Sequence, residues 1–166
     1  MALAADLGGA PTRLLPMTRH HIEAVAAIEQ VSQTHPWSRR MFEDCLDAGY
    51  SGWVLEAEGP AVVAFAVNSL AMDDAHLLNL AVAPTARRGG LARRLLDHVL
   101  TQARAAEAQR VLLEVRESNG AAVGLYADAG FRLLARRRGY YPAAGGRRED
   151  ALVMVCALAD GVGGGA

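Results

Sequence analysis

The sequence has little that would bind a metal ion or cross-link the chain. Its 166 residues include two cysteines, Cys45 and Cys156, which lie far apart and have no partners at the spacing of metal ligands. We expect both to be buried free thiols. The five histidines also form no ligand pattern, since two are adjacent at 20 and 21 and the others are scattered. No metal site is therefore expected.

Other features that would indicate a function are absent as well. A GxxxxGK[ST] sequence is missing, which excludes a P-loop, and without GxGxxG a dinucleotide-binding fold is not expected. The formal net charge of −1 provides no overall field that would attract nucleic acid or an anionic membrane. No apolar run is long enough to span a bilayer, and the N-terminus lacks a basic leader followed by a long apolar core. We therefore expect a cytoplasmic protein that binds neither nucleic acid nor membrane.

The composition is typical of a folded domain. Hydrophobic residues make up 52% of the chain and charged residues 21%, which fits a soluble globular protein and excludes a disordered chain. The length allows one full core, so we expect a single domain over residues 12–160. Residues 1–11 and 161–166 are expected to be flexible termini because they are rich in small residues and lie at the ends.

The apolar periodicity and the turn signals predict the element order β-α-α-β-β-β-α-β-α-β-β. This order predicts an α/β (α+β) fold, with a mixed, mainly antiparallel sheet of about seven strands and about four helices on its faces. Ser38 and Asn119 are expected to cap helices, and Gly130 to end one. The expected strands lie near 14–17, 53–58, 61–70, 75–84, 110–117, 131–141 and 150–158, and the expected helices at 18–33, from 38 onward, 90–105 and 119–129.

The most informative stretch joins the expected strand 75–84 to the helix 90–105. Arg87, Arg88, Gly89 and Gly90 stand directly before the helix, where glycine costs backbone entropy. A loose turn with solvated arginines is one interpretation. The other is an anion-binding loop, because the first turn of a helix presents unpaired N–H groups and the positive end of the dipole, and glycine lets the backbone approach a ligand closely.

Residues 87–92, RRGGLA, resemble the R/Q-x-x-G-x-G/A signature of the acetyl-CoA-binding loop in GNAT-type N-acetyltransferases. The segment LLEVRESNGAAVGLYADAGF, 112–131, also resembles the family. So do Pro36-Trp37-Ser38, Leu78-Asn79-Leu80-Ala81-Val82, Tyr140-Tyr141-Pro142 and Arg148-Glu149-Asp150-Ala151. Together these segments look like bacterial members that acetylate the N-terminal alanine of small-subunit ribosomal protein eighteen, and the likeness covers about residues 14–158.

The resemblance implies the GNAT fold, acetyl-CoA as co-substrate and no metal. It implies that the pyrophosphate of acetyl-CoA lies at the helix start, while the pantetheine arm pairs with the strand before it. From the residues alone, the strand positions also fit plain sheet core, and Asn119 fits a helix cap. The implied cofactor-binding residues are Leu80, Ala81, Val82, Arg87, Arg88, Gly89, Gly90, Leu91, Ala92, Arg93 and Asn119.

Acetyl transfer to an amine requires a base for the ammonium and benefits from a proton donor to the departing thiolate. Glu114 lies in mid-strand, on the same face as Leu112 and Arg116 and between apolar neighbours. We expect burial to raise its pKa toward that of a useful base. A salt bridge with Arg116 or another arginine is the alternative. The resemblance implies that Glu114 is the general base, either directly or through water.

Tyr126 lies two helical turns beyond Asn119, where a tyrosine usually packs in the core with its hydroxyl satisfied. The resemblance implies that Tyr126 donates the proton to the thiolate. Trp37 is compatible with a plug between the first two helices. The resemblance implies instead that peptide substrate enters beside Trp37 and Ser38, with Tyr140 and Tyr141 opposite.

Three functions fit these residues. The first is N-terminal α-amino acetylation of the ribosomal protein's alanine, by direct transfer from the thioester. An α-amino group has a pKa near about 7.7–8, against about 10.4 for lysine, so a modest carboxylate base suits it better. The second is acetylation of a small amine or a protein lysine by the same residues. The third is a CoA-binding module without catalysis, which would have no use for Glu114 and Tyr126 together.

Overall fold

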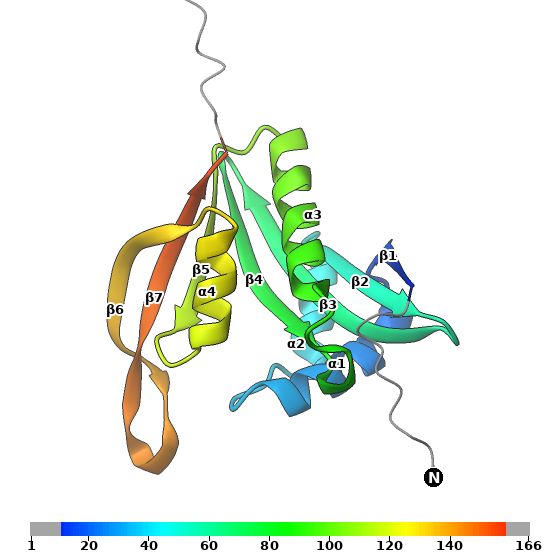
Figure 1. Cartoon of the computed structure of the whole chain (residues 1–166), viewed down its shortest axis with the longest axis horizontal. Helices are drawn as coiled ribbons and strands as arrows, with labels where there is room; N and C mark the ends of the chain where they lie inside the picture. The colour runs from blue at the N-terminus through cyan, green and yellow to red at the C-terminus, as the bar shows by residue number, and fades with distance from the viewer. Residues whose placement is uncertain (1–10, 159–166) are drawn as a thin grey trace, which may run out of the picture. The chain divides into compact units, whose positions relative to one another are not determined.

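The computed structural model describes residues 11–158, so the expected flexible termini lie outside the described residues except for Pro11. Its strands form one seven-stranded sheet in the order β1-β2-β3-β4-β5-β7-β6 (Figure 1). The strands are β1 (Thr12–Pro16), β2 (Ser51–Ala57), β3 (Ala61–Ala71), β4 (Asp74–Val82), β5 (Arg110–Arg116), β6 (Arg132–Pro142) and β7 (Arg148–Ala157). The α-helices are α1 (Ile22–Ser32), α2 (Arg39–Asp47), α3 (Leu91–Ala105) and α4 (Gly120–Asp128).

The predicted order of strands and helices is confirmed. β4 and β5 pair in parallel, from Asp74 opposite Arg110 to Leu77 opposite Leu113. Parallel neighbours need a long crossover connection, and α3 lies in the segment that joins them. The pairs β1–β2, β2–β3, β5–β7 and β6–β7 are antiparallel. The sheet is therefore mixed and mainly antiparallel, as expected.

The first helix differs from its prediction at the start. Arg19–His21 is a 3₁₀ turn, and α1 begins only at Ile22. The ring of His21 reaches back, and its Nδ1 accepts a hydrogen bond from the backbone N–H of Thr18 at 2.9 Å. Thr18 is the N-cap of this turn and forms a capping box with His21, so only the first turn, which is 3₁₀ and not α, differs from the expected helix.

Tertiary contacts divide the described chain into two compact units. Unit 1 contains residues 11–69 and 79–98, and unit 2 contains residues 70–78 and 99–158. The strands β3 and β4 and the helix α3 contribute residues to both units. The single domain over 12–160 stays a prediction.

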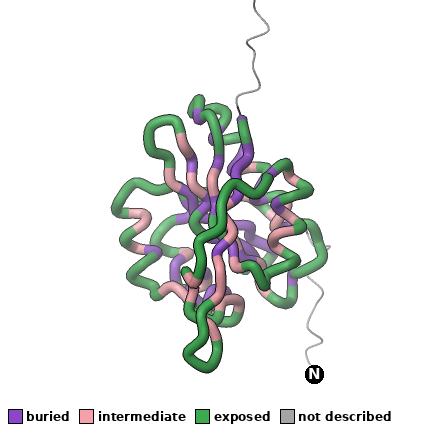
Figure 2. The backbone as a smooth tube through the Cα atoms, turned by 90° about the vertical axis from the view of Figure 1, so that its left-hand side faces the viewer, coloured by how far each residue is buried: buried purple, intermediate pink, exposed green. Residues whose placement is uncertain are grey.

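The core of unit 1 joins α1 and α2 to the strands β2 and β3. The ring of Phe42 meets the ring of Phe65 edge-on, with centroids 5.4 Å apart, and both side chains are fully buried. In Figure 2 the turns are mostly exposed, and so is almost all of the edge strand β6, while buried positions, purple, gather on the other strands and on the helices. The cluster consists of Met17, Ile22, Val25, Ile28, Phe42, Val54, Phe65, Val67 and Ala81.

Unit 2 buries one face of β5 and much of β7. Val111, Leu113 and Val115 are buried on β5, which confirms the predicted alternation. The helix α4 ends as expected at Gly130, whose φ of +101° favours glycine. Cys156 is buried in this unit, whereas Cys45 of unit 1 is half-buried rather than buried. Both thiols are free, and burial raises the pKa of each.

Candidate functional site

The predicted cofactor-binding strand and loop lie within unit 1. On β4, Ala81 is buried while Leu80 and Val82 are half-buried. After the strand, the N–H of Ala83 donates to the carbonyl oxygen of Val63 at 2.8 Å, and a 3₁₀ turn, Pro84–Ala86, leads into the loop. The loop is therefore anchored on the sheet directly before the helix α3 begins.

Two backbone positions of the loop before α3 lie in the left-handed region. Arg88 has a φ of +67° and Gly90 a φ of +74°, so two positions flanking Gly89 are left-handed. Such turns direct successive N–H groups toward one side, and the positive end of α3 follows at Leu91. A left-handed arginine is strained, which is common in ligand-binding loops. Binding of a pyrophosphate by this loop stays a prediction.

Gly90 is the loop position that favours glycine, and the reason is its backbone conformation. A Cβ built on Gly90 would meet no atom within 4 Å, so φ and not crowding disfavours a side chain there.

The arginines of the loop have different partners. Arg87 donates from Nε to the carbonyl oxygen of Val82 at 3.3 Å and so ties the loop to β4. Arg93 donates from Nε to Asp97 at 2.9 Å. Arg94 instead binds the backbone and hydroxyl oxygens of Thr12. Arg87 and Arg88 are exposed, so the loop offers positive charge to an anion in solution.

The segment 36–38 also belongs to unit 1. The Oγ of Ser38 accepts the N–H of Met41 at 3.2 Å, which confirms the predicted cap of α2. The indole of Trp37 packs on Phe42, with ring centroids 5.3 Å apart, so the tryptophan does help to close the core. Since Trp37 is only half-buried and Ser38 is exposed, both also present surface. A peptide-binding role for the pair stays a prediction.

Glu29 is a buried acid that was not singled out from the sequence. Its side chain is 1% exposed, and its Oε2 accepts the backbone N–H of Trp37 at 3.1 Å and the amide of Asn79 at 2.7 Å. Burial raises the pKa of Glu29, while the two hydrogen bonds lower it by less. The available signal was its place beside Ile28 on the apolar stripe of the helix.

Unit 2 contains the predicted acid and base. The expected burial of Glu114 is wrong, because its side chain is 30% exposed, and its Oε1 lies 3.1 Å from the Nε of Arg137 on β6. Its apolar sequence neighbours point to the opposite face of β5 and so cannot bury it. The alternative of a salt bridge with an arginine is correct, with Arg137 in place of Arg116.

Arg116 holds the far end of the β6–β7 hairpin instead. It donates to the carboxylate of Glu149 at 2.9 Å and to the carbonyl oxygen of Pro142 at 2.8 Å. Its guanidinium lies 4.5 Å from the ring centroid of Tyr141. The hydrogen bonds from Arg116 and Ser118 lower the pKa of Glu149. The sequence did not indicate this positioning role.

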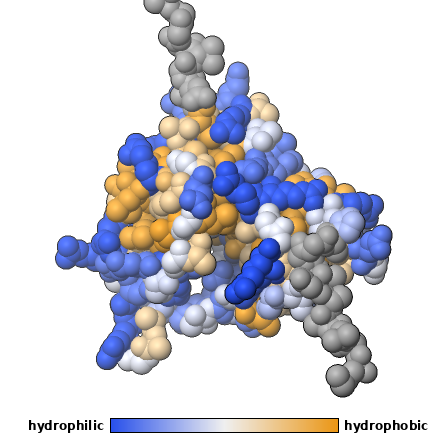
Figure 3. Space-filling view, in the orientation of Figure 1, coloured by the Kyte–Doolittle hydropathy of each residue, from blue (hydrophilic) through white to orange (hydrophobic). Residues whose placement is uncertain are grey.

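Tyr140 and Tyr141 lie against each other on this hairpin, with ring centroids 5.0 Å apart. Arg137 contacts the ring of Tyr140 at 5.3 Å. Burial, followed by the negative charge of Glu114, raises the pKa of Tyr141 to about 12. At the hairpin end, at the lower left of Figure 3, hydrophilic side chains in blue lie beside tan and white residues of higher hydropathy. Tyr141 is thus near enough to Glu114 for the charge of the carboxylate to act on it.

Tyr126 on α4 is 8% exposed and contacts Phe131, with ring centroids 5.7 Å apart. Burial, with a smaller contribution from Tyr141, raises the pKa of Tyr126 to about 12. Asn119 accepts the N–H of Ala122 at 3.2 Å and so caps α4, as expected. Unit 2 therefore combines a carboxylate paired with arginine and two tyrosines that stay protonated at neutral pH.

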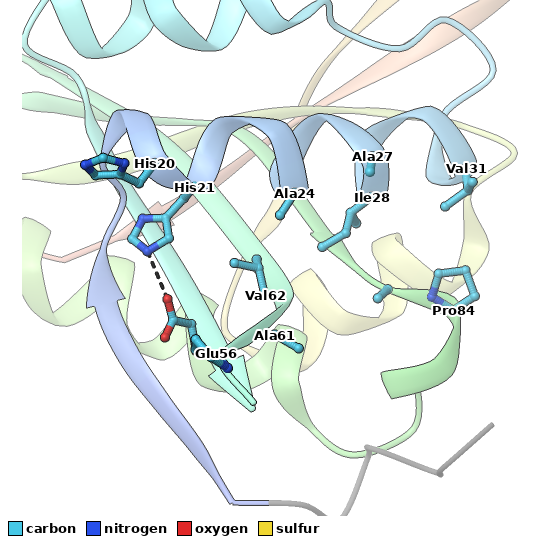
Figure 4. A pocket seen from close by; sticks show the side chains of 12 residues that line it. His20, His21, Ala24, Ala27, Ile28, Val31, Glu56, Ala61, Val62 and Pro84 are labelled. Atoms are coloured by element: carbon cyan, nitrogen blue, oxygen red, sulfur yellow. Dashed lines mark hydrogen bonds and ion pairs between the residues drawn. The ribbon is translucent and has the colours of Figure 1, made fainter. Parts of the chain in front are cut away.

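Unit 1 also contains a cavity of about 620 Å³ between α1, the β2–β3 hairpin and Pro84 (Figure 4). At its edge the Nε2 of His21 lies 2.9 Å from a carboxylate oxygen of Glu56. Since Nδ1 accepts the Thr18 N–H, Nε2 is the donor to Glu56. The lining contains none of the predicted site residues, so the cavity is separate from the expected chemistry.

Within residues 11–158, no group of three or more His, Cys, Asp or Glu side chains is placed to hold a metal ion. The helices described for these residues include none whose length and apolar character would let it cross a membrane.

Comparison with known proteins identifies the relatives of this chain. The ribosomal protein bS18-alanine N-acetyltransferase of Escherichia coli K12 is 38% identical over 133 residues, covering 80% of this chain and 88% of that protein. The corresponding protein of Haemophilus influenzae is 35% identical over 136 residues, covering 82% and 92%. The crystal structure of the ribosomal-protein-S18-alanine N-acetyltransferase from Escherichia coli matches with a TM-score of 0.83 and 34% identity, covering 89% of this chain and 94% of that one.

A family model agrees with these likenesses. The model described as the acetyltransferase (GNAT) family matches residues 20–131, which include the arginine–glycine loop, Glu114 and Tyr126. The strand order and the four described α-helices are those of the GNAT fold. The chain belongs to the GNAT family of acetyltransferases.

Proposed function

We propose that this chain is an acetyl-CoA-dependent acetyltransferase of protein N-termini, and that its substrate is the N-terminal alanine of ribosomal protein bS18. The observation that carries the chemistry is the grouping of Glu114 with Tyr126 and Tyr141 in unit 2, because it supplies a base and protonated donors together. The substrate is inferred from the bS18-alanine enzymes that this chain resembles. A ribosomal substrate would place the reaction in the cytoplasm.

The acetyl-CoA-binding strand and loop are assigned to unit 1. In unit 2, Asn119 is proposed as a further residue that contacts acetyl-CoA. The backbone N–H groups of residues 88–93 bind the pyrophosphate, supported by the left-handed Arg88 and Gly90 and by the start of α3. Arg87, Arg88 and Arg93 add positive charge. Backbone groups of Leu80, Ala81 and Val82 pair with the pantetheine arm as a neighbouring strand would. No metal takes part in this proposal.

In the proposed reaction Glu114 takes a proton from the α-ammonium of the peptide, directly or through a water molecule. The free amine attacks the carbonyl carbon of the thioester, a C–N bond forms and the C–S bond breaks. Tyr126 gives its proton to the departing thiolate, and the second proton that the nitrogen loses as the amide forms restores the tyrosine hydroxyl. The pKa of Tyr126, about 12, keeps the hydroxyl protonated until the thiolate departs. Arg137 orients the carboxylate of Glu114 from β6.

Within unit 1, Trp37 and Ser38 are proposed to contact the peptide. Within unit 2, Tyr140 and Tyr141 are proposed to contact the peptide. Aromatic rings offer apolar surface together with a polar atom, which suits a peptide backbone and its side chains. Arg116 and Arg137 hold the two tyrosines by contacts to their rings.

The proposal is tested by mass spectrometry of peptides incubated with the enzyme and saturating acetyl-CoA. A peptide beginning Ala-Arg-Tyr-Phe should gain one acetyl group on its α-nitrogen. The control peptide has the same sequence with a blocked N-terminus and an internal lysine, and polyamines are offered separately. Absence of α-N-acetylation, or faster turnover of the lysine peptide or a polyamine, would contradict the proposed substrate.

A further inference from the structure

Glu29 breaks the local rules for a stable helix. It is the least exposed ionisable residue of the described chain, and it stands in the last turn of α1. Burial disfavours a carboxylate, and the negative end of the helix dipole disfavours it further. Its Oε1 is buried without a hydrogen-bond partner among the described residues. A buried carboxylate of this kind lowers the stability of the fold, so its function must lie in the hydrogen bonds that its other oxygen, Oε2, accepts.

The Oε2 atom of Glu29 joins two segments that the proposed function uses. It accepts the backbone N–H of Trp37, in the segment proposed to bind peptide. It also accepts the side-chain amide of Asn79, which directly precedes Leu80 on the strand proposed to bind the pantetheine arm. Glu29 and Asn79 are 50 positions apart in the chain, and both are buried. One carboxylate oxygen thus links the two binding segments within unit 1.

Two other contacts hold the segment 36–38 in place. Ser38, the next residue, is fixed by its cap on α2, and the Trp37 ring is fixed by Phe42. The backbone N–H of Trp37 donates its hydrogen bond to Glu29. Removal of the carboxylate would free the backbone at Trp37 while leaving the cap and the ring contact in place.

We propose that Glu29 is a positioning residue for the peptide substrate, holding the segment 36–38 against Asn79 of β4 so that the peptide binds next to the acetyl-CoA strand. The inference rests on the proposed function. It predicts that Glu29 affects the binding of peptide far more than the binding of acetyl-CoA, because β4 belongs to the sheet and segment 36–38 is the part left free. A purely structural role predicts lower stability with equal effects on both substrates.

Two substitutions separate these roles. Glu29→Leu removes both hydrogen bonds and leaves the N–H of Trp37 and the amide of Asn79 without an acceptor. It should raise the KM for the alanine peptide about tenfold, as expected for losing about one hydrogen bond to a charged group. The kcat and the Kd for acetyl-CoA should change little. Glu29→Gln retains one amide oxygen that can accept both bonds, so it should restore the peptide KM.

Glu56→Leu is the matched control. Glu56 is the other buried acid of unit 1, 8% exposed, and its carboxylate contacts His21 and Arg13 and not segment 36–38. The same substitution there should lower stability and leave the peptide KM unchanged. Equal KM effects at Glu29 and Glu56 would overturn the proposal.

A second readout needs no substrate. The chain has two tryptophans, so in a Trp53→Phe background the fluorescence reports Trp37 alone. Acrylamide quenching of Trp37 should increase with Glu29→Leu and return with Glu29→Gln. If Glu29→Leu fails to fold, Asn79→Ala removes one of the two bonds, and it should raise the peptide KM by a smaller factor.

The outcomes distinguish the two proposals. A wild-type protein that acetylates no alanine peptide refutes the proposed function, while the quenching result still decides whether Glu29 holds the segment. Wild-type acetylation with normal peptide KM in folded Glu29→Leu, or unchanged quenching, refutes the inference and leaves the proposed function standing.

Discussion

Gly90→Ala should weaken the binding of acetyl-CoA without removing any side-chain contact. The backbone at Gly90 has a φ of +74°, and a Cβ there would meet no atom within 4 Å, so the whole effect comes from the conformation. Holding an alanine in the left-handed region costs about 1–2 kcal/mol. If the free loop relaxes and must return to this conformation to bind the pyrophosphate, that cost appears in binding. The Kd for acetyl-CoA should then rise about 5–30-fold.

Two controls separate the conformation from stability and from side-chain size. Gly49 also has a positive φ, +81°, with open space around its Cβ position, but it follows α2 outside the loop. Gly49→Ala should reduce stability by a similar amount and leave acetyl-CoA binding intact. Gly90→Asn introduces a larger residue that tolerates the left-handed region, so this variant should bind acetyl-CoA more tightly than Gly90→Ala does.

Titration calorimetry with acetyl-CoA and urea unfolding measure the two effects on the same proteins. A folded Gly90→Ala protein that loses stability like Gly49→Ala while keeping the wild-type Kd would refute the anion-binding loop. In that case the positive φ would serve only to turn the chain into α3.

Three further predictions follow from the same structure. Tyr126→Phe should slow turnover equally from pH 6 to about pH 10, because a hydroxyl with a pKa of about 12 is protonated throughout, and rate–pH profiles of both proteins test this. A profile that converges with wild type at high pH would contradict the donor role. Glu29 should make the stability of the fold depend on pH. Its pKa is raised above 4.5 in the folded state, so the protonated form of Glu29 favours folding. The free energy of unfolding of the wild type, relative to that of Glu29→Gln, should therefore fall as the pH rises from about 4.5. If the difference in free energy of unfolding between the two proteins, measured in urea, stays constant over that pH range, the prediction is wrong. Arg116→Met should raise the peptide KM, because it removes the hydrogen bonds and the ring contact that hold the hairpin end; an unchanged KM would refute its positioning role.

Features that depend on neighbouring residues were predictable from the sequence. Ser38 and Asn119 cap helices by reaching three positions along the chain, which is a local signal. The alternation along β5 and the glycine at the end of α4 are local in the same sense. The element order followed from such signals, and the parallel pairing of β4 and β5 agrees with the long connection between them.

Features that depend on tertiary contacts were not predictable in this way. The partner of Glu114 is Arg137 on β6. The sequence has three consecutive arginines at 136–138, and nothing in it indicated which of them would reach the carboxylate of Glu114. The contact of Glu29 with Asn79 spans 50 positions. The left-handed backbone conformation of Arg88 is imposed by the folded loop, because arginine does not favour this conformation.

The central claim is that Glu114 removes the proton from an α-ammonium group, and the pH dependence of Glu114→Gln tests it most directly. At neutral pH the variant should lose about 10²–10⁴-fold in kcat/KM for the alanine peptide, while acetyl-CoA still binds. The deficit should shrink as the pH rises above about 8, because the amine of the peptide then arrives deprotonated. A folded variant that stays equally impaired at pH 10 would show that Glu114 does not deprotonate the amine.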